Sequence, residues 1–209
     1  MRGVSVLHIQ NLSFSHPDQP ALFIDWSARI GSGVTLVHGD TGSGKSTLLR
    51  LMSGASPVEG KLQLAGVSLA DDPEAYRRQV FFCEPATDAF DQVSAGDCAS
   101  SLTAGDAHFD PAEWQSLVDG FALTPHLHKP MYMLSTGSKR KVWLAAALAS
   151  GRALILLDEP TAALDAASIR CLWAALSTRG QQDGQAIVVA SFERIDRVPL
   201  AGLIELPPR

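Results

Sequence analysis

The chain has 209 residues, of which 46% are hydrophobic and 19% are charged, and its formal net charge is -5. This length fits one α/β domain and leaves no room for a second full domain beside it. The composition excludes a disordered or low-complexity chain. The acidic balance lacks the basic field that sequence-independent binding to a phosphate backbone needs, so we expect no nucleic-acid partner.

The compartment can be inferred from cysteine usage and hydropathy. The cysteines (Cys83, Cys98 and Cys171) are odd in number and far apart, which favours buried thiols in a reducing compartment over disulfides or zinc ligands. No stretch approaches the roughly 18 apolar residues of a membrane-spanning helix. The first ten residues alternate like a strand and lack the features of a secretory signal. We therefore expect a cytoplasmic chain.

The first part of the chain has a β pattern. Residues 4–14 and 21–30 predict two antiparallel strands separated by the turn-rich segment SHPDQP. A third strand is predicted over 34–38, where VTLVH is apolar and β-branched. It leads into a glycine-rich loop and a helix over 45–52, which together form a strand-loop-helix unit.

The middle of the chain, from about 88 to 141, is polar and predicts a helical insert within a single domain of residues 1–209. One helix is clear, because Asp110 is suited to cap it and Pro111 to begin it. Its apolar face consists of Trp114, Leu117, Val118 and Phe121.

The last third returns to α/β alternation. The pattern predicts a helix from about 139 to 150, a strand over 153–157, a helix after Asp165 and a strand over 186–190. The closing LPPR is expected to be a frayed end.

The loop after the third strand matches the pattern G-x-x-x-x-G-K-[ST]. It consists of Gly39, Asp40, Thr41, Gly42, Ser43, Gly44, Lys45, Ser46 and Thr47. Successive N–H groups of such a loop and the positive end of the following helix can hold a polyphosphate. Lys45 would then reach the β and γ phosphates, and the Ser46 hydroxyl would bind Mg²⁺. The alternative is a glycine-rich turn with a solvated lysine.

Two acids, Asp158 and Glu159, end the apolar strand ALILL. A buried strand seldom ends in adjacent carboxylates unless they serve a cation or a reaction. Next to a phosphate loop, Asp158 is suited to the Mg²⁺ shell, and Glu159 is suited to orient or deprotonate a water. The alternative is a strand that runs out into a solvated loop.

Between these motifs, residues 134–142 read LSTGSKRKV, and here the sequence resembles the ATP-binding cassette (ABC) ATPases. Their signature is usually LSGGQ, followed by a basic cluster and an Ala-rich helix. Residues 159–165, EPTAALD, are similar to the family's stretch from the catalytic Glu to the D-loop. The resemblance runs from the opening strands to Ala190.

The resemblance implies an α/β fold of ABC ATPase type, with a P-loop core, an N-terminal antiparallel sheet and a helical subdomain. It also implies a head-to-tail dimer that binds two ATP with Mg²⁺. Ser135 and the N–H of Gly137 would bind the γ-phosphate held by the opposite subunit, and Asp165 would cross the dimer contact. His16 stands where the family has an aromatic residue that stacks on adenine, and the alternative for His16 is an exposed turn histidine.

Several positions depart from the family pattern. Thr136 and Ser138 replace the usual Gly and Gln of the signature. Glu84 occupies the place of the Q-loop Gln, where it could meet Mg²⁺, although a shift of one position would put Cys83 there. Phe192 stands at the switch position, and phenylalanine cannot donate the hydrogen bond that the family's His gives to the γ-phosphate. ATP binding is therefore better supported than fast hydrolysis.

The sequence favours the ATPase subunit of an ABC transporter, lying on the inner face of the cell membrane. It would act as a homodimer or heterodimer that drives a separate permease. Its short length, without a C-terminal regulatory extension, is similar to the ATP-binding subunit of the haem exporter of bacterial cytochrome c maturation. A catalytically weak cassette that serves as an ATP-gated regulatory subunit is the main alternative. The acidic charge disfavours a DNA-repair or translation protein, and the signature disfavours a P-loop kinase.

Overall fold

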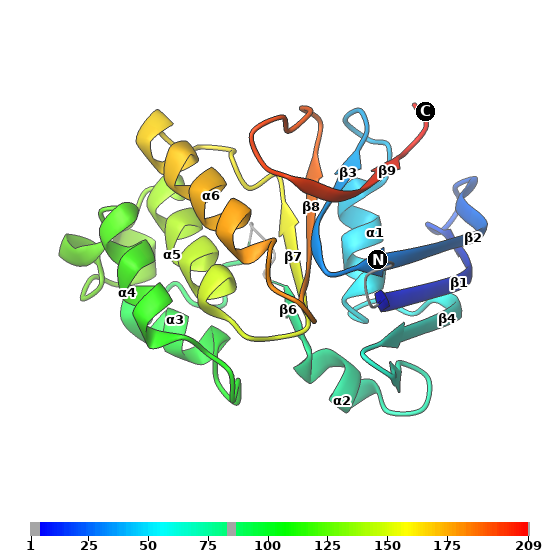
Figure 1. The fold of residues 1–209 in the computed structure, drawn as a ribbon, viewed down its shortest axis with the longest axis horizontal. Helices are drawn as coiled ribbons and strands as arrows, with labels where there is room; N and C mark the ends of the chain where they lie inside the picture. The colour runs from blue at the N-terminus through cyan, green and yellow to red at the C-terminus, as the bar shows by residue number, and fades with distance from the viewer. Residues whose placement is uncertain (1–4, 83–86, 209) are drawn as a thin grey trace.

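The computed structural model describes residues 5–82 and 87–208, which form two β-sheets and a group of helices (Figure 1). The antiparallel sheet has the order β2-β1-β4-β5, with β1 (Ser5–Ser15), β2 (Ala21–Gly31), β4 (Glu59–Leu64) and β5 (Val67–Ser68). The parallel sheet has the order β6-β7-β8-β3-β9, with β3 (Gly33–His38), β6 (Val80–Phe82), β7 (Leu154–Asp158), β8 (Ala186–Ser191) and β9 (Leu200–Glu205). The helices are α1 (Lys45–Met52), α2 (Pro73–Arg78), α3 (Ala95–Leu102), α4 (Pro111–Gly120), α5 (Thr136–Ala149) and α6 (Ala166–Arg179). Short 3-10 turns lie at η1 (Thr124–His126) and η2 (Met131–Met133).

The predicted opening is confirmed, since β1 and β2 pair antiparallel from Ser5–Gly31 to Ser15–Ala21. β4 pairs with the other side of β1 and was not predicted from the sequence. Half of its residues, EGKLQL, are polar and none is β-branched, so the segment carries little local strand signal.

Alternate residues of the parallel sheet face two different layers. In β7, Leu154 and Leu156 pack toward α1 and the antiparallel sheet, whereas Ile155 and Leu157 pack toward the helices on the opposite face. α1 therefore lies between the two sheets, and α5 and α6 cover the other face of the parallel sheet (Figure 1). Both faces are covered, as the fold class of a parallel α/β sheet requires.

The predicted helix after Asp110 is present as α4, and the Asp110 carboxylate accepts hydrogen bonds from the N–H groups of Ala112 and Glu113. The predicted start of the next helix was three residues late. α5 begins at Thr136, because the Ser135 hydroxyl caps it by accepting from the N–H of Ser138 at 3.1 Å. The strand predicted over 153–157 is β7 and is shifted by one residue.

The end of the chain is better ordered than the sequence predicts. β9 pairs in parallel with β3 at the edge of the sheet. Leu206, which the sequence assigns to a frayed end, is 7% exposed, and its N–H donates to the carbonyl of His38. Within the described ranges, no helix is both long and apolar enough to cross a membrane.

Candidate functional site

The candidate site lies at the carboxyl ends of three neighbouring strands of the parallel sheet. His38 at the end of β3 pairs with Ser191 of β8, and Asp158 at the end of β7 pairs with Ala190 of β8. The segments that follow these strands therefore start side by side. The carboxyl edge of a parallel sheet is where such folds place their ligands.

The phosphate loop leaves β3 and turns directly into α1. Gly42 and Gly44 have φ angles of 84° and 101°, a left-handed conformation that favours glycine. Gly44 caps α1 without a side-chain hydrogen bond, and the first turn of α1 holds no acidic residue. A Cβ on Gly39 would lie 2.6 Å from the Ser43 hydroxyl. The loop thus surrounds a helix N-terminus that is suited to an anion.

The Lys45 side chain is 7% exposed and turns back over the loop. Its Nζ donates to the carbonyl of Gly39 at 2.7 Å and to that of Asp40 at 3.1 Å. The same Nζ lies 3.5 Å from Oε1 of Glu159. One cation therefore joins the phosphate loop to the segment that follows β7.

A groove of about 330 Å³ runs along the outer side of the loop. It is lined by His16, Gln19, Leu22, Gly42, Gly44, Lys45, Ser46 and Thr47. The His16 ring lies 3.3 Å from the Thr47 hydroxyl through Nε2, and it meets the Phe14 ring edge to face. Asp40, Thr41 and Ser46 are exposed. The structure thus brings His16 beside the loop residues with which it was predicted to act.

Glu159 is held in an unusual main-chain conformation. Its φ is 42°, which for a residue other than glycine costs about 1–3 kcal/mol and persists only where the surroundings fix it. Its Oε1 accepts a hydrogen bond from the N–H of Phe192 at 3.0 Å. Burial raises the pKa of the Glu159 carboxyl above its ordinary value, against the opposing effects of Lys45 and of the Phe192 amide. The arrangement gives a desolvated carboxylate next to a buried lysine.

Asp158 ends β7 on the same face as Leu154 and Leu156, which pack toward α1. Its Oδ1 is buried and has no hydrogen-bond partner among the residues that the structure describes, and the same holds for the Ser43 hydroxyl. Buried oxygens without partners are unfavourable unless a ligand or an ion satisfies them. Hard oxygen donors of this kind suit Mg²⁺. Glu84 and Cys83, the predicted Q-loop candidates, lie outside the described residues.

The predicted signature segment packs on the segment that follows β7. Ser135 is exposed at the N-terminus of α5, and Gly137 packs so closely on the carbonyl of Ala163 that an added Cβ would be 2.4 Å from that oxygen. Asp165 caps α6 by accepting from Ser168, and it pairs with Lys141 at 2.7 Å. The Lys141 hydrogen bond holds the pKa of Asp165 well below its usual range. No hydrogen bond within the described chain joins Ser135 or Gly137 to the phosphate loop.

Comparison with known proteins assigns the family. The model of the ABC transporter family matches residues 24–162, which is more than half of the chain. The chain belongs to the ABC transporter family. It is 35% identical over 178 residues to the cytochrome c biogenesis ATP-binding export protein CcmA of Pseudomonas aeruginosa, covering 83% of this chain and 87% of that protein.

Further relatives agree with this assignment. The CcmA protein of Rhodospirillum rubrum is 38% identical over 182 residues, covering 84% of this chain and 75% of the relative. The solved structure of an ATP-binding subunit of an ABC transporter superposes with a TM-score of 0.74 at 23% identity, covering 89% of this chain and 79% of that chain. The recognised family and the predicted ABC ATPase fold are therefore both confirmed. The chain is an ATP-binding subunit of this family.

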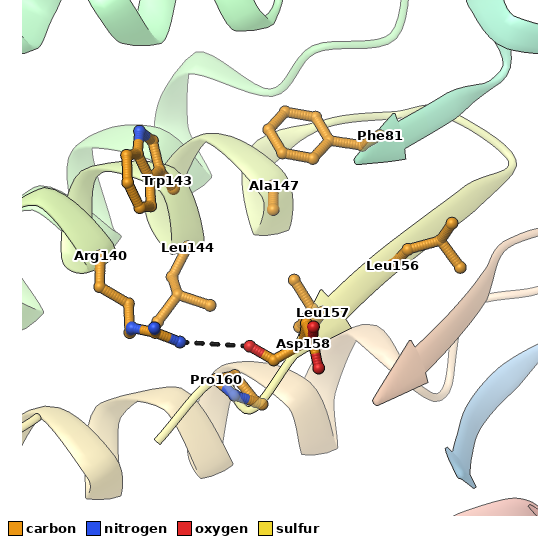
Figure 2. A pocket seen from close by; sticks show the side chains of 9 residues that line it. All are labelled: Phe81, Arg140, Trp143, Leu144, Ala147, Leu156, Leu157, Asp158 and Pro160. Atoms are coloured by element: carbon orange, nitrogen blue, oxygen red, sulfur yellow. Dashed lines mark hydrogen bonds between the residues drawn. The ribbon is translucent and has the colours of Figure 1, made fainter. Parts of the chain in front are cut away.

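Two features of this ABC subunit were missed by the sequence reasoning. Arg140 of α5 donates through Nη1 to the carbonyl of Glu159 at 2.6 Å and to that of Asp158 at 3.2 Å. Figure 2 shows Arg140 extending from α5 toward the end of β7. Phe192 contributes its main-chain N–H to Glu159, while its side chain is 56% exposed. The run KRK at 139–141 was the only available signal for Arg140, and a main-chain contact leaves no signal in a sequence.

Proposed function

We propose that this chain hydrolyses ATP and thereby drives a separate membrane permease through ATP-dependent dimerisation. The observation that carries the proposal is the position of Lys45. Its ammonium lies against the loop carbonyls of Gly39 and Asp40 and 3.5 Å from Glu159. A buried cation in this position can bind a polyphosphate that the loop holds. The partly desolvated carboxylate beside it can orient the water that attacks this polyphosphate.

ATP would be bound by the phosphate loop, from Gly39 to Thr47. The N–H groups at the start of α1 and the Lys45 ammonium would hold the phosphates. His16 would stack on adenine from the groove that it lines with Thr47. The unpartnered Asp158 oxygen and the exposed Ser46 hydroxyl fit a Mg²⁺ ion, with Glu84 as a further candidate. Bound Mg²⁺ would neutralise charge on the phosphates.

Glu159 would act as the general base. The Phe192 N–H fixes one carboxylate oxygen, so that the other is left to accept a proton from water. Burial raises the pKa of this carboxyl, which makes it a stronger proton acceptor than an ordinary Glu. Lys45 beside it stabilises this partly buried anion.

Dimerisation would complete the site. Ser135 is exposed at the N-terminus of α5, where helical N–H groups favour an anion. We propose that Ser135 and Gly137 meet the γ-phosphate bound by a second subunit, identical or related, and that Asp165 lies at this contact. Residues 1–209 would act as one nucleotide-binding domain, with 88–141 as its helical subdomain.

The permease is proposed because the chain belongs to the ABC transporter family and two relatives are named as ATP-binding export proteins. These names favour export as the direction of transport. The subunit would then lie on the inner face of the cell membrane, bound to the permease.

Two observations favour a second candidate, a catalytically weak cassette that acts as an ATP-gated regulatory subunit. The Phe192 side chain can donate no hydrogen bond to a γ-phosphate. Thr136 also adds a β-branched side chain at the exposed start of α5.

The test combines ATP binding, phosphate release and purification from membranes. We expect the purified chain to bind ATP in a Mg²⁺-dependent manner, with weaker Mg²⁺ dependence in Ser46→Ala. A tagged Glu159→Gln chain, loaded with ATP, should retain a multi-span membrane protein. Binding without phosphate release, both alone and with that protein, would establish the weak cassette. Hydrolysis by a chain that stays monomeric and retains no membrane protein would overturn the dimerisation and the transport role, and would leave the ATPase activity standing.

A further inference from the structure

The first two turns of α5 contact the segment 159–165 at three places. Gly137 packs on the carbonyl of Ala163, Lys141 pairs with Asp165, and Arg140 donates to the carbonyl of Glu159. The first two contacts involve the outer part of the segment. Only the contact of Arg140 reaches the residue that carries the partly buried carboxylate next to Lys45.

The hydrogen bonds of the Arg140 guanidinium go to the main chain at the end of β7. Its Nη1 bonds both main-chain carbonyls at the end of β7, at 2.6 Å and 3.2 Å. Its Nε is buried and has no hydrogen-bond partner within the described residues. The side chain borders a cavity of about 30 Å³ between α5 and β7, where Trp143 and Pro160 also lie (Figure 2). Burial lowers the pKa of the guanidinium, although Asp158 and Glu159 oppose this effect. A desolvated cation of this kind is unfavourable unless its position is useful or well bonded.

The carbonyl that Arg140 contacts belongs to a residue in a left-handed main-chain conformation. Glu159 has a φ of 42°, its N–H donates to Ala190 at 2.9 Å, and its carbonyl also accepts from the N–H of Ala162 at 3.0 Å. The direction of the side chain follows from the orientation of these two peptide units. A shift of the Glu159 main chain would therefore move the carboxylate relative to Lys45 and the phosphate loop.

We propose that Arg140 is a positioning residue for ATP hydrolysis, which holds the Glu159 main chain so that its carboxylate faces the phosphate loop. The proposal rests on the proposed ATPase function and adds a specific residue to it. Arg140 lies five residues after Ser135, on the same helix. The helix that presents the predicted signature thus also sets the orientation of the carboxylate in its own chain.

The test uses Arg140→Met, which keeps the apolar stem and removes the donors, and Arg140→Lys, which keeps one cationic donor. Arg170→Met is the matched control, since Arg170 is exposed on the neighbouring helix α6. We expect kcat of Arg140→Met to fall about 10- to 100-fold, because small misplacements of reacting groups lower the rate by factors of this size. KM for ATP should change by less than about twofold, because the phosphate loop is untouched. Arg140→Lys should recover part of kcat, and the control should match the wild type.

Two further measurements separate positioning from a general structural role. In the Glu159→Gln background, Arg140→Met should cause no additional loss of kcat, because the group that it positions is gone. Hydrogen exchange of the 158–164 segment should be faster in Arg140→Met and unchanged in Arg170→Met. Unchanged exchange, an additive double mutant, or parallel losses in kcat and ATP affinity would each overturn the proposal. If the wild type hydrolyses no ATP, the proposed ATPase function fails, and the exchange measurement still decides whether Arg140 holds this turn.

Discussion

Replacement of Glu159 by glutamine changes one atom at the centre of the candidate site. The amide oxygen can still accept the Phe192 N–H, which donates to Oε1 at 3.0 Å in the wild type. Lys45 loses the carboxylate at 3.5 Å but keeps the carbonyls of Gly39 and Asp40 at 2.7 and 3.1 Å. The geometry of the site should therefore survive, and what disappears is the ability to accept a proton.

The size of the effect follows from that single loss. A general base contributes about 10²- to 10⁴-fold to a rate, so we expect kcat of Glu159→Gln to fall by this factor. ATP affinity should not fall, because neither the loop nor Lys45 is altered. With hydrolysis stopped, the variant should accumulate as an ATP-bound dimer, whereas the wild type without its partner should be mostly monomeric.

The thermal stability of Glu159→Gln should increase relative to that of the wild type at neutral pH, although its kcat falls. The pKa of Glu159 is raised by burial above the ordinary value of 4.5, so the ligand-free protein is relatively stabilised by protonation of this group. That contribution is fully present below about pH 4.5 and is lost as the pH rises through the raised pKa. The neutral amide of Glu159→Gln avoids the loss. Its Tm relative to that of the wild type should therefore increase between pH 4.5 and pH 7.

The assays are phosphate release, nucleotide titration, size-exclusion chromatography with ATP and Mg²⁺, and thermal unfolding across this pH range. A variant that hydrolyses ATP within about threefold of the wild-type rate would show that Glu159 is not the base. A purely monomeric variant in saturating ATP would instead contradict the dimer. A Tm difference that does not depend on pH would contradict the electrostatic description of the site.

Three further predictions concern the loop, the signature and the switch position. Lys45→Ala should weaken ATP binding at least about tenfold, since a charged hydrogen-bond donor is lost, and unchanged affinity in a folded variant would refute the loop assignment. Gly137→Ala should lower Tm, although alanine normally favours a helix, because its Cβ would lie 2.4 Å from the Ala163 carbonyl and overpacking costs about 1–3 kcal/mol. Phe192→His should raise kcat by up to about 100-fold with little change in ATP affinity, as measured by steady-state phosphate release. An unimproved or reduced rate would mean that another group already supplies the donor.

Local signals in the sequence were sufficient for the elements that build the phosphate site. The strand before Gly39 and the helix from Lys45 to Met52 follow from a β-branched run, a glycine-rich loop and an apolar helical face. The cap at Asp110 was equally local, because an N-cap contacts only the next three residues. Such features can be predicted because sequence neighbours form them.

Elements that depend on distant partners were not predictable in this way. β9 is an edge strand with alternating exposure, and what orders it is its pairing with β3, more than 160 residues earlier in the chain. The early start of α5 at Thr136 was hidden for a related reason. Gly137 and Ser138 are weak helix formers, and the cap from Ser135 together with packing on Ala163 decides the boundary.

The same distinction applies to the orientation of the Glu159 carboxylate. The main-chain N–H of Phe192 donates to this carboxylate, and we propose that the guanidinium of Arg140 orients it through the main-chain carbonyl of the same residue. A main-chain donor does not depend on the side chain that it carries, so Phe192 holds the Glu159 carboxylate through its N–H although its side chain can donate no hydrogen bond. Position 192 can therefore have two separate roles, a main-chain contact with Glu159 and a side-chain contact with the γ-phosphate. A family pattern records only the side chain. We predict that the contact with the γ-phosphate is the part that this chain lacks, and for this reason we expect hydrolysis to be slowed and not abolished.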